Sequence, residues 1–482
     1  MVNSIVEAIK NYSVSQPDKR CVVDAKIEYT YAEYYKKIKN VAAFLNENGV
    51  KKGDKVIIKT AQNLLFLATF HAIHLIGAVA VPLEKTVKAE RVYEINEVVE
   101  AVCYICDKPI EEINCLLYND IDACENEYEP DSLPMSSDDS TILFTTGTTG
   151  KSKGILMCHA ADVAVAENVV GGTEMTKENV EVIPQPLNHS FSIRRYYANM
   201  INGSTVIIMD GVIFVNRFFD AFDKNGATSA AMAPSALAVI FKLSADKLAE
   251  YDGKIEYLQF GGSYMPESDK DKIRELLPSA RLYNFYGSTE AGCSSIIDFN
   301  KEKENPYNIG KATVNSDIRF VDENNNFVET DANNPARLVT GGKMLMNEYY
   351  KEPELTAQTL IDGYIYSNDM GYIDEKGNII MLGRMDDVII CGGQKISPLD
   401  VENVCNKYEG VVECAVIGID DAIMGQVAKL FVVVNEKYDE MSMMQFLGER
   451  LENFQVPKIV QIIKEIPKTF NGKPLKRELK NM

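Results

Sequence analysis

Short runs of β-branched and aromatic residues alternate with helical stretches through roughly the first 380 residues of this 482-residue chain. Four of the clearest runs are residues 55–60, 204–209, 255–260 and 280–287. Such alternation predicts α/β layering with largely parallel strands. The chain is also too long for one ordinary domain, so we expect at least two.

A smaller unit follows the polar segment at residues 382–390. Its predicted elements are, in order, a helix starting at Ser397 and Pro398, strands at 414–419 and 428–434, and a helix over about 442–454. We therefore predict an N-terminal domain over residues 1–384 and a C-terminal domain over residues 385–482, joined by a hinge. The predicted fold class is α/β, with a large multi-layer domain of mixed sheets and helices and a small α+β domain.

The formal net charge of −20 disfavours nucleic acid as a general partner, because binding a phosphate backbone needs concentrated lysine and arginine. Among ten scattered cysteines the one close pair is Cys103 and Cys106, with no second pair to complete a zinc site. We interpret that pair as small hydrophobic residues in a strand. The N-terminus lacks the apolar stretch of a secretory signal, so we expect a reduced cytoplasmic protein.

One uncharged segment, residues 61–83, is long enough to span a bilayer. Glycine, proline and histidine interrupt it, and it resolves better into a buried helix around 64–75 and a strand at 78–81. We therefore predict no integral membrane segment. His71 and His74 share one face of this helix, and we interpret them as packed core residues rather than metal ligands.

The most informative segment is TILFTTGTTGKSKG at residues 141–154, in which an apolar strand leads into threonine, glycine and lysine. Glycine lets the backbone approach a ligand and turn its N–H groups inward, and threonine hydroxyls add further donors. Lys151 and Lys153 would offset the charge of an anion. This pattern predicts a phosphate-binding loop.

Two other motifs nearly match the same residues. The Walker pattern requires a glycine where this chain has Thr145, so a P-loop NTPase is disfavoured. Residues 150–154 satisfy the G-x-S-x-G pattern of serine hydrolases, which leaves a hydrolase using Ser152 as a remote alternative. A hydrolase would need a later histidine, and only His159 and His189 follow that serine.

Four segments resemble, in order, the motifs of the adenylate-forming superfamily, which includes acyl-CoA synthetases, peptide-synthetase adenylation domains and luciferases. They are TTGTTGKSKG at 145–154, NFYGSTE at 284–290, GRMDDVIICGGQKISPLDVE at 383–402 and PKTFNGKPLKREL at 467–479. The likeness covers nearly the whole chain and is greatest to AMP-forming acyl-CoA synthetases. It implies an acid–CoA ligase that converts a carboxylic acid and ATP to an acyl-adenylate and pyrophosphate, then transfers the acyl group to coenzyme A.

The resemblance also implies residue roles. Tyr286 stacks on adenine, and Asp369 binds the ribose with Arg384 as its companion. Thr289 bonds to the α-phosphate and Glu290 helps to hold Mg²⁺, which fits a reaction that brings two anions together. The implied nucleotide-binding set is Thr145, Thr146, Gly147, Thr148, Thr149, Gly150, Lys153, Gly261, Gly262, Ser263, Tyr286, Gly287, Asp369 and Arg384.

The C-terminal domain is implied to act in both half-reactions. Lys473 matches the catalytic lysine that bridges the acyl carboxylate and the α-phosphate, whereas Gly392 and Gly393 match the loop that lines the coenzyme A tunnel. The two cannot face the site together, so the domain is expected to rotate about Asp386, which occupies the hinge position. His189 resembles a family histidine beside the acyl pocket that helps to close the site between half-reactions.

The sequence says little about which carboxylic acid is the substrate. Tyr264 replaces a residue that is usually small in the family, and we expect it to narrow the acyl pocket. We interpret Arg194 and Arg195 as surface residues, with the weaker hypothesis that one pairs with a second carboxylate of a dicarboxylic or aromatic acid. An acyl carrier protein acting in trans is an alternative thiol, loaded with an acid or an amino acid. We expect a monomer or homodimer.

Overall fold

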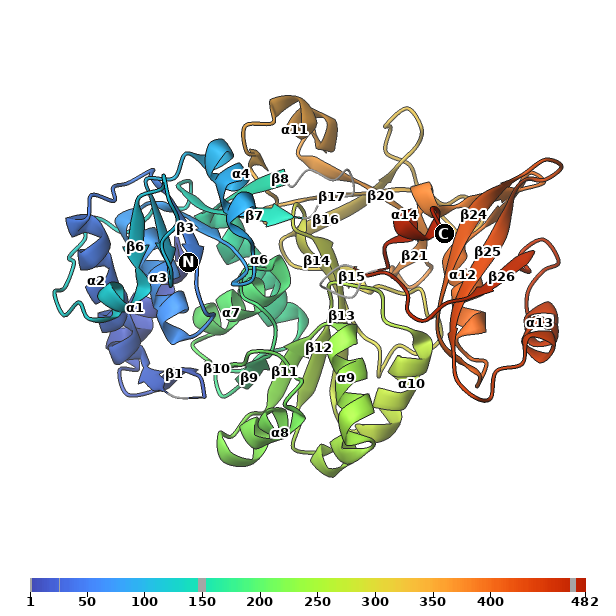
Figure 1. Cartoon of the computed structure of the whole chain (residues 1–482), viewed down its shortest axis with the longest axis horizontal. Helices are drawn as coiled ribbons and strands as arrows, with labels where there is room; N and C mark the ends of the chain where they lie inside the picture. Colours follow the sequence, from blue (N-terminus) through green and yellow to red (C-terminus); the bar gives the residue numbers. More distant parts are fainter. Residues whose placement is uncertain (1, 26, 146–152, 469–473) are drawn as a thin grey trace.

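The computed structural model describes residues 2–25, 27–145, 153–468 and 474–482. In these ranges a large domain with three sheets precedes a small C-terminal domain with its own sheet (Figure 1). The predicted α/β fold, with a large mixed-sheet domain and a small α+β domain, is confirmed. The proposed boundary between residues 384 and 385 stays a prediction.

The largest sheet has nine strands in the order β15-β14-β13-β12-β11-β9-β10-β1-β2. Neighbours from β13 to β1 are parallel, and the outer strands at both edges are antiparallel. The parallel strands therefore end at one common edge, where ligands bind in sheets of this kind. The strands are β1 Arg20–Val23, β2 Glu28–Thr30, β9 Val180–Ile183, β10 Thr205–Ile208, β11 Ser229–Met232, β12 Tyr257–Phe260, β13 Arg281–Ser288, β14 Gly292–Asp298 and β15 Lys311–Ala312.

A second sheet has seven strands in the order β18-β8-β7-β4-β3-β5-β6, parallel from β7 to β6. Its edge strand β18 is distant in sequence and pairs antiparallel with β8. Cys103 and Cys106 lie in the buried strand β5, as predicted. The strands are β3 Lys55–Lys59, β4 Val79–Pro82, β5 Cys103–Cys106, β6 Cys115–Leu117, β7 Asp139–Thr145, β8 Lys153–Cys158 and β18 Glu348–Tyr349.

The third sheet is antiparallel, and its last strand leads into the small domain. Its strands are β16 Ser316–Val321, β17 Ala336–Gly342, β19 Leu360–Ile361, β20 Tyr364–Ile373 and β21 Ile379–Arg384. A short 3₁₀ turn, η2 Met385–Asp387, links β21 to the first strand of the small domain. The predicted hinge residue Asp386 therefore lies in the link between the two sheets.

In the part of the small domain that the structure describes, there are a five-stranded sheet and three helices. Its elements are β22 Ile389–Cys391, β23 Gln394–Ile396, α12 Pro398–Cys405, β24 Val411–Asp421, β25 Gly425–Val434, α13 Glu440–Gly448, β26 Ile459–Ile462 and α14 Lys476–Leu479. The helix predicted over 442–454 is shorter: it ends at Gly448, and glycine is a poor helix former.

The helices of the large domain cover its sheets (Figure 1). They are α1 Ile5–Ser15, α2 Tyr31–Glu47, α3 Leu64–Ile76, α4 Ala89–Val99, α5 Tyr118–Asp122, α6 His159–Gly172, α7 Ser190–Asn202, α8 Val215–Lys224, α9 Pro234–Ser244, η1 Lys247–Tyr251, α10 Glu267–Leu276 and α11 Pro353–Thr359. Asn63 caps the start of α3, and Gly77 ends it in the left-handed conformation. The uncharged segment thus divides into α3 and β4 as predicted. No helix in the described ranges has the length and apolar content to cross a membrane.

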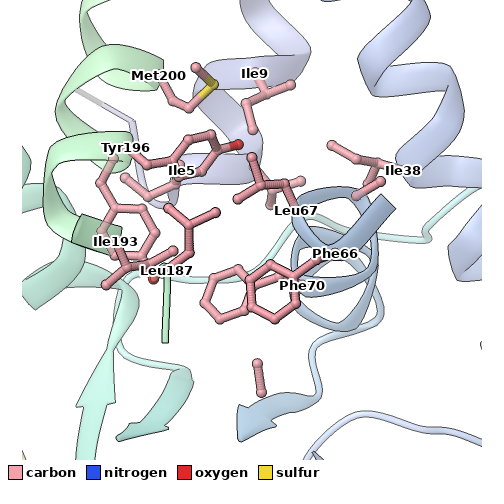
Figure 2. Close-up of a cluster of buried hydrophobic side chains, with 14 of the residues drawn as sticks. Ile5, Ile9, Ile38, Phe66, Leu67, Phe70, Leu187, Ile193, Tyr196 and Met200 are labelled. Atoms are coloured by element: carbon pink, nitrogen blue, oxygen red, sulfur yellow. The ribbon is translucent and has the colours of Figure 1, made fainter. Parts of the chain in front are cut away.

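A hydrophobic core lies where α1, α2, α3 and α7 meet. Figure 2 shows Ile5 and Ile9 of α1, Phe66 of α3, and Tyr196 and Met200 of α7 converging there. Burying such large apolar side chains contributes about 1.5–3 kcal/mol each. This core anchors α7, whose first turn faces the site described next.

Candidate nucleotide-binding site

Two parallel strands of the nine-stranded sheet carry predicted site residues at their carboxyl ends. β12 and β13 are in register from Tyr257↔Arg281 to Phe260↔Asn284. Gly261, Gly262 and Ser263 follow β12, and Tyr286 to Glu290 lie at the end of β13 and in the turn to β14. The sheet geometry therefore brings the segment 261–263 beside the motif at residues 284–290.

The residues predicted to bind adenine and ribose lie together. The Tyr286 hydroxyl donates a 2.5 Å hydrogen bond to Asp369 Oδ2, and Asp369 faces Arg384 across the β20–β21 pair. Burial and the Asp369 carboxylate raise the pKa of Tyr286, so its hydroxyl stays a donor at neutral pH. Arg384 in turn lies 3.1 Å from Asp386 in η2. The residues predicted to bind the nucleoside are thus in contact with the link to the small domain.

The turn after β13 presents the residues predicted to meet phosphate and metal. Thr289 Oγ1 lies 3.1 Å from Ser190 Oγ at the start of α7. Glu290 Oε1 accepts a 2.7 Å hydrogen bond from the Tyr349 hydroxyl, and the Lys153 ammonium lies 5.4 Å from the centre of the Tyr349 ring. A cation, a carboxylate and a hydroxyl are therefore gathered beside the end of β7, where Thr145 pairs with Lys153.

Two of the predicted glycines are required by close packing. A Cβ at Gly261 would lie 1.8 Å from Phe285 Cε1 and 2.9 Å from Phe191 Cε2. The two phenylalanine rings stack above it with centroids 5.2 Å apart and planes inclined by 8°. A Cβ at Gly287 would lie 1.9 Å from the Gly292 carbonyl oxygen, so a side chain there would break the β13–β14 hairpin. Larger residues at either position would disturb the site.

His189 is the N-cap residue of α7 and directly precedes Ser190, whose hydroxyl contacts Thr289. Burial lowers its pKa, against an opposing contribution from Glu84. The imidazole is therefore neutral at pH 7. A neutral imidazole placed there can donate or accept a hydrogen bond without adding charge beside an anionic ligand.

The small-domain loop with Gly392 and Gly393 faces solvent. Both glycines have positive φ, 56° and 83°, and form the exposed tip of the β22–β23 hairpin. Asp386 accepts hydrogen bonds from Asn368 at 2.8 Å and Arg384 at 3.1 Å. In this orientation the hairpin predicted to line a thiol tunnel is turned to the outside of the molecule.

The family of the chain is decided by comparison with family models. The model described as AMP-binding enzyme matches residues 10–350, and the one described as AMP-binding enzyme C-terminal domain matches residues 400–473. This chain belongs to the AMP-binding enzyme family. The resemblance to the adenylate-forming superfamily is thereby confirmed.

Relatives of this AMP-binding enzyme match it along nearly its whole length. The 2-succinylbenzoate–CoA ligase of Bacillus cereus (strain Q1) is 24% identical, and that of Bacillus cytotoxicus is 26% identical, each over 97% of this chain and 96% of the relative. ATP-bound MatB from Rhodopseudomonas palustris is 22% identical with a TM-score of 0.90, covering 100% of this chain and 99% of that one. The o-succinylbenzoate CoA synthetase (MenE) of Bacillus subtilis in complex with the acyl-adenylate intermediate OSB-AMP is 21% identical with a TM-score of 0.86, covering 98% of each chain.

Arg194 and Arg195 of the AMP-binding enzyme are buried, so their interpretation as surface residues was wrong. Arg195 is 1% exposed and pairs with the fully buried Glu181, and it also donates to the Tyr257 hydroxyl at 3.0 Å. Arg194 donates to two backbone carbonyls. Burial of a charged group is tolerated when such partners compensate its lost hydration.

Tyr264, which was expected to narrow the acyl pocket, extends to the small domain. Its hydroxyl donates to Asn403 Oδ1 on α12. Ser263 and Gly262 beside it stay at the end of β12. Several predicted residues lie outside the described ranges: Thr146, Gly147, Thr148, Thr149, Gly150, Lys151, Ser152 and Lys473.

Sequence reasoning missed Tyr349 and Ser190. Tyr349 reaches Glu290 only because β18 pairs with β8, opposite Ile155. Residues 348–349 form a strand too short to show a periodic pattern. Ser190 follows the predicted His189, and its contact with Thr289 depends on the packing of α7 against the end of β13.

The donor set suits a cation shared with phosphate oxygens. Within the described ranges no three His, Cys, Asp or Glu side chains come together as a metal cage. Mg²⁺ is commonly held by one or two carboxylates together with substrate phosphates and water. Glu290, half-buried and oriented by Tyr349, fits such a single protein ligand.

Proposed function

We propose that this chain is an AMP-forming acid–CoA ligase, with the cluster around Tyr286, Asp369 and Glu290 as its ATP site. The observation that supports this most is the 2.5 Å hydrogen bond between Tyr286 and Asp369, which brings the residue predicted to stack on adenine into contact with the residue predicted to bind ribose. Thr289 and Glu290 continue from these two residues toward Lys153 and the end of β7. This arrangement would place the adenosine of ATP at Tyr286 and Asp369, and its phosphates at Thr289, Glu290 and Lys153.

In the first half-reaction a carboxylate oxygen of the acid attacks the α-phosphorus of ATP. The bond from that phosphorus to the bridging oxygen of the β-phosphate breaks, and pyrophosphate leaves with the electron pair. Thr289 donates its hydroxyl to the α-phosphate, and Lys473 bridges both reacting anions, as the family resemblance implies. Glu290 would hold Mg²⁺, which would supply positive charge to the phosphate oxygens. Preorganised donors of this kind lower the barrier where negative charge develops.

In the second half-reaction the sulfur of coenzyme A attacks the acyl carbon of the adenylate. The bond from that carbon to the AMP oxygen breaks, AMP leaves, and the thiol proton passes to solvent. Gly392 and Gly393 would line the path of the thiol, and they are exposed in the present orientation. We therefore propose that the small domain rotates about Asp386 between the two steps.

A direct assay identifies the carboxylic acid that is activated and the thiol that accepts the acyl group. An acyl carrier protein in trans is the second acceptor to test, and a cytoplasmic location and a monomeric or dimeric state stay predictions. The assay supplies ATP and Mg²⁺ with 2-succinylbenzoate, anthranilate, fatty acids of several lengths and simple dicarboxylic acids. Acid-dependent exchange of pyrophosphate into ATP, followed by AMP and thioester formation on adding coenzyme A, is the expected result.

Three outcomes would overturn parts of the proposal. ATP hydrolysis that does not depend on any acid would indicate an NTPase, and ester cleavage without ATP would indicate a hydrolase using Ser152. Acyl transfer to a phosphopantetheinyl carrier protein, without transfer to coenzyme A, would reassign the acceptor. Mass spectrometry of the thioester product distinguishes the last outcome from the expected one.

A further inference from the structure

Three successive carbonyl groups of the turn after β13 are held from outside that turn. The Ser288 carbonyl accepts from Arg194 Nη1 at 2.7 Å, and the Thr289 carbonyl accepts from Arg194 Nη2 at 2.6 Å. The Glu290 carbonyl accepts from the Met346 amide at 2.8 Å. With its backbone fixed in this way, the turn can direct the side chains of Thr289 and Glu290 without freedom to rotate its peptide planes.

Arg194 reaches this turn from α7 and is 5% exposed. A buried guanidinium is costly unless it is hydrogen-bonded and balanced by an opposite charge. The two carbonyls supply the hydrogen bonds, and Asp162 on α6, 4% exposed, lies close enough to raise the pKa of Arg194 against the effect of burial. Burial raises the pKa of Asp162 itself to about 7, so the two carbonyls are the direct hydrogen-bond partners that hold Arg194 against the turn.

We propose that Arg194 is a positioning residue for acid adenylation: its rigid guanidinium fork fixes the turn that places Thr289 against the α-phosphate and Glu290 at the metal. This rests on the proposed function. It differs from the hypothesis that an arginine here pairs with a second carboxylate of the acid, because both terminal nitrogens of Arg194 already donate to the protein backbone. Arg195 is likewise committed, to Glu181.

Arg194→Lys is the informative substitution, since lysine keeps the charge but cannot hold two carbonyls with one planar fork. We expect kcat for pyrophosphate exchange to fall by about 10–100-fold, the range typical for groups that orient a metal ligand. The Mg²⁺ concentration for half-maximal exchange should rise, and KM for the acid should change little. A rise in KM for the acid with kcat intact would overturn the inference and favour direct contact with the acid.

Arg195→Lys is the matched control. It changes the adjacent residue of the same helix, which is equally buried but is paired with Glu181 on β9. This variant should lose thermal stability while its folded fraction exchanges pyrophosphate within a few-fold of wild type at unchanged Mg²⁺ requirement. Equal kinetic losses in both variants would mean that Arg194 is merely structural.

Chemical rescue and nucleotide binding distinguish a positioning role for Arg194 from a general loss of stability. Guanidinium ions at millimolar concentration should restore part of the exchange rate of Arg194→Ala, and ammonium at equal ionic strength should not. Calorimetric binding of MgATP needs no acid, and Arg194→Lys should weaken it. If the wild-type protein binds MgATP but catalyses pyrophosphate exchange with none of the acids, the proposed function is wrong. The effect of Arg194→Lys on MgATP binding can still be measured in that case. Failure of both Arg194 variants to fold, with Arg195→Lys folded, would also overturn the positioning role.

Discussion

Tyr264 of the large domain donates its hydroxyl proton to the side-chain oxygen of Asn403, on the first helix of the small domain. Asn403 Nδ2 donates to the Tyr307 hydroxyl at 3.2 Å, and that hydroxyl donates to Asp400 Oδ1 at 2.5 Å. Two tyrosines of one domain thus hold α12 of the other. This interdomain hydrogen-bond chain, Tyr264–Asn403–Tyr307–Asp400, stabilises the orientation in which Gly392 and Gly393 face solvent.

Tyr264→Phe removes one hydrogen bond of this chain and leaves the buried Asn403 oxygen without that donor. Such a loss costs about 1–3 kcal/mol, enough to shift a two-state domain equilibrium by about 5–150-fold. The domain orientation in this structure, with Gly392 and Gly393 exposed, is the one we assign to adenylation. Because Tyr264→Phe would make it less populated, we expect pyrophosphate exchange to slow relative to thioester formation from a preformed acyl-adenylate. Separate assays of the two half-reactions measure this ratio.

Tyr251→Phe is a suitable control for that ratio. Tyr251 donates a 2.8 Å hydrogen bond to Asp223 within the large domain, so its loss lowers stability without touching α12. The ratio of the two half-reactions should be unchanged. A ratio that is also unchanged in Tyr264→Phe would mean that the chain of hydrogen bonds does not bias the domains.

Tyr349→Phe tests whether Glu290 is oriented by its tyrosine partner. The substitution removes the 2.7 Å hydrogen bond to Glu290 Oε1 and keeps the ring beneath Lys153. We expect the Mg²⁺ concentration for half-maximal exchange to rise about 10-fold, the lower end of the range for outer-shell groups. Tyr350→Phe, at the next residue and packed against Lys55, should leave it unchanged. Equal Mg²⁺ requirements in Tyr349→Phe and Tyr350→Phe would contradict the role of Tyr349 in orienting Glu290.

Asp386→Pro tests the hinge. Proline fixes φ, and the side chain that accepts from Asn368 and Arg384 is lost. We expect one half-reaction to be impaired much more than the other, because one domain orientation would be favoured. Rates of pyrophosphate exchange and of thioester formation measure this. A similar loss in both would count against rotation at this residue.

Lys473→Ala tests the residue assigned to adenylation by resemblance. Removing one donor that stabilises developing charge typically costs about 10²–10³-fold in rate. Exchange of pyrophosphate should fall by that factor, whereas calorimetric ATP binding should be nearly unchanged. Lys480→Ala removes an exposed lysine of the same tail and should have little effect. Full exchange activity in Lys473→Ala would refute the assignment.

The parts of the fold predicted best were those set by local pattern. The strands predicted at 55–60, 204–209, 255–260 and 280–287 differ from β3, β10, β12 and β13 by only one or two residues at an end, since continuous apolar runs specify buried parallel strands. The sequence could associate Tyr286 with Asp369 only through the family resemblance, which assigns one to adenine and the other to ribose. Their separation of 83 residues carries no local signal.

The failures arose where burial depends on a distant partner. Arg195 is buried because Glu181 neutralises it, and Arg194 because carbonyls 94 and 95 residues away accept its hydrogen bonds. Nothing in the sequence around either arginine distinguishes it from an exposed one. The same holds for Tyr264, whose partner Asn403 lies 139 residues along the chain.

The buried histidines predict an acid-sensitive core. His71 and His74 of α3 lie with ring centroids 5.5 Å apart, and His74 lies 5.0 Å from His159 of α6. Burial lowers the pKa of His71 to about 3 and that of His159 to about 4. In the unfolded chain these groups titrate near 6.5, so below that pH the unfolded state binds protons that the folded state does not.

The free energy of unfolding should therefore decrease as the pH falls from about 6.5 toward 4, by up to about 1.4 kcal/mol per pH unit for each histidine. His71→Leu removes one such group, and thermal unfolding followed from pH 8 to pH 5 should show a shallower decline than wild type. Phe66→Leu, at an equally buried residue of the same helix, should lower stability by the same amount at every pH. Parallel declines for wild type and His71→Leu would show that His71 protonation does not contribute to acid unfolding.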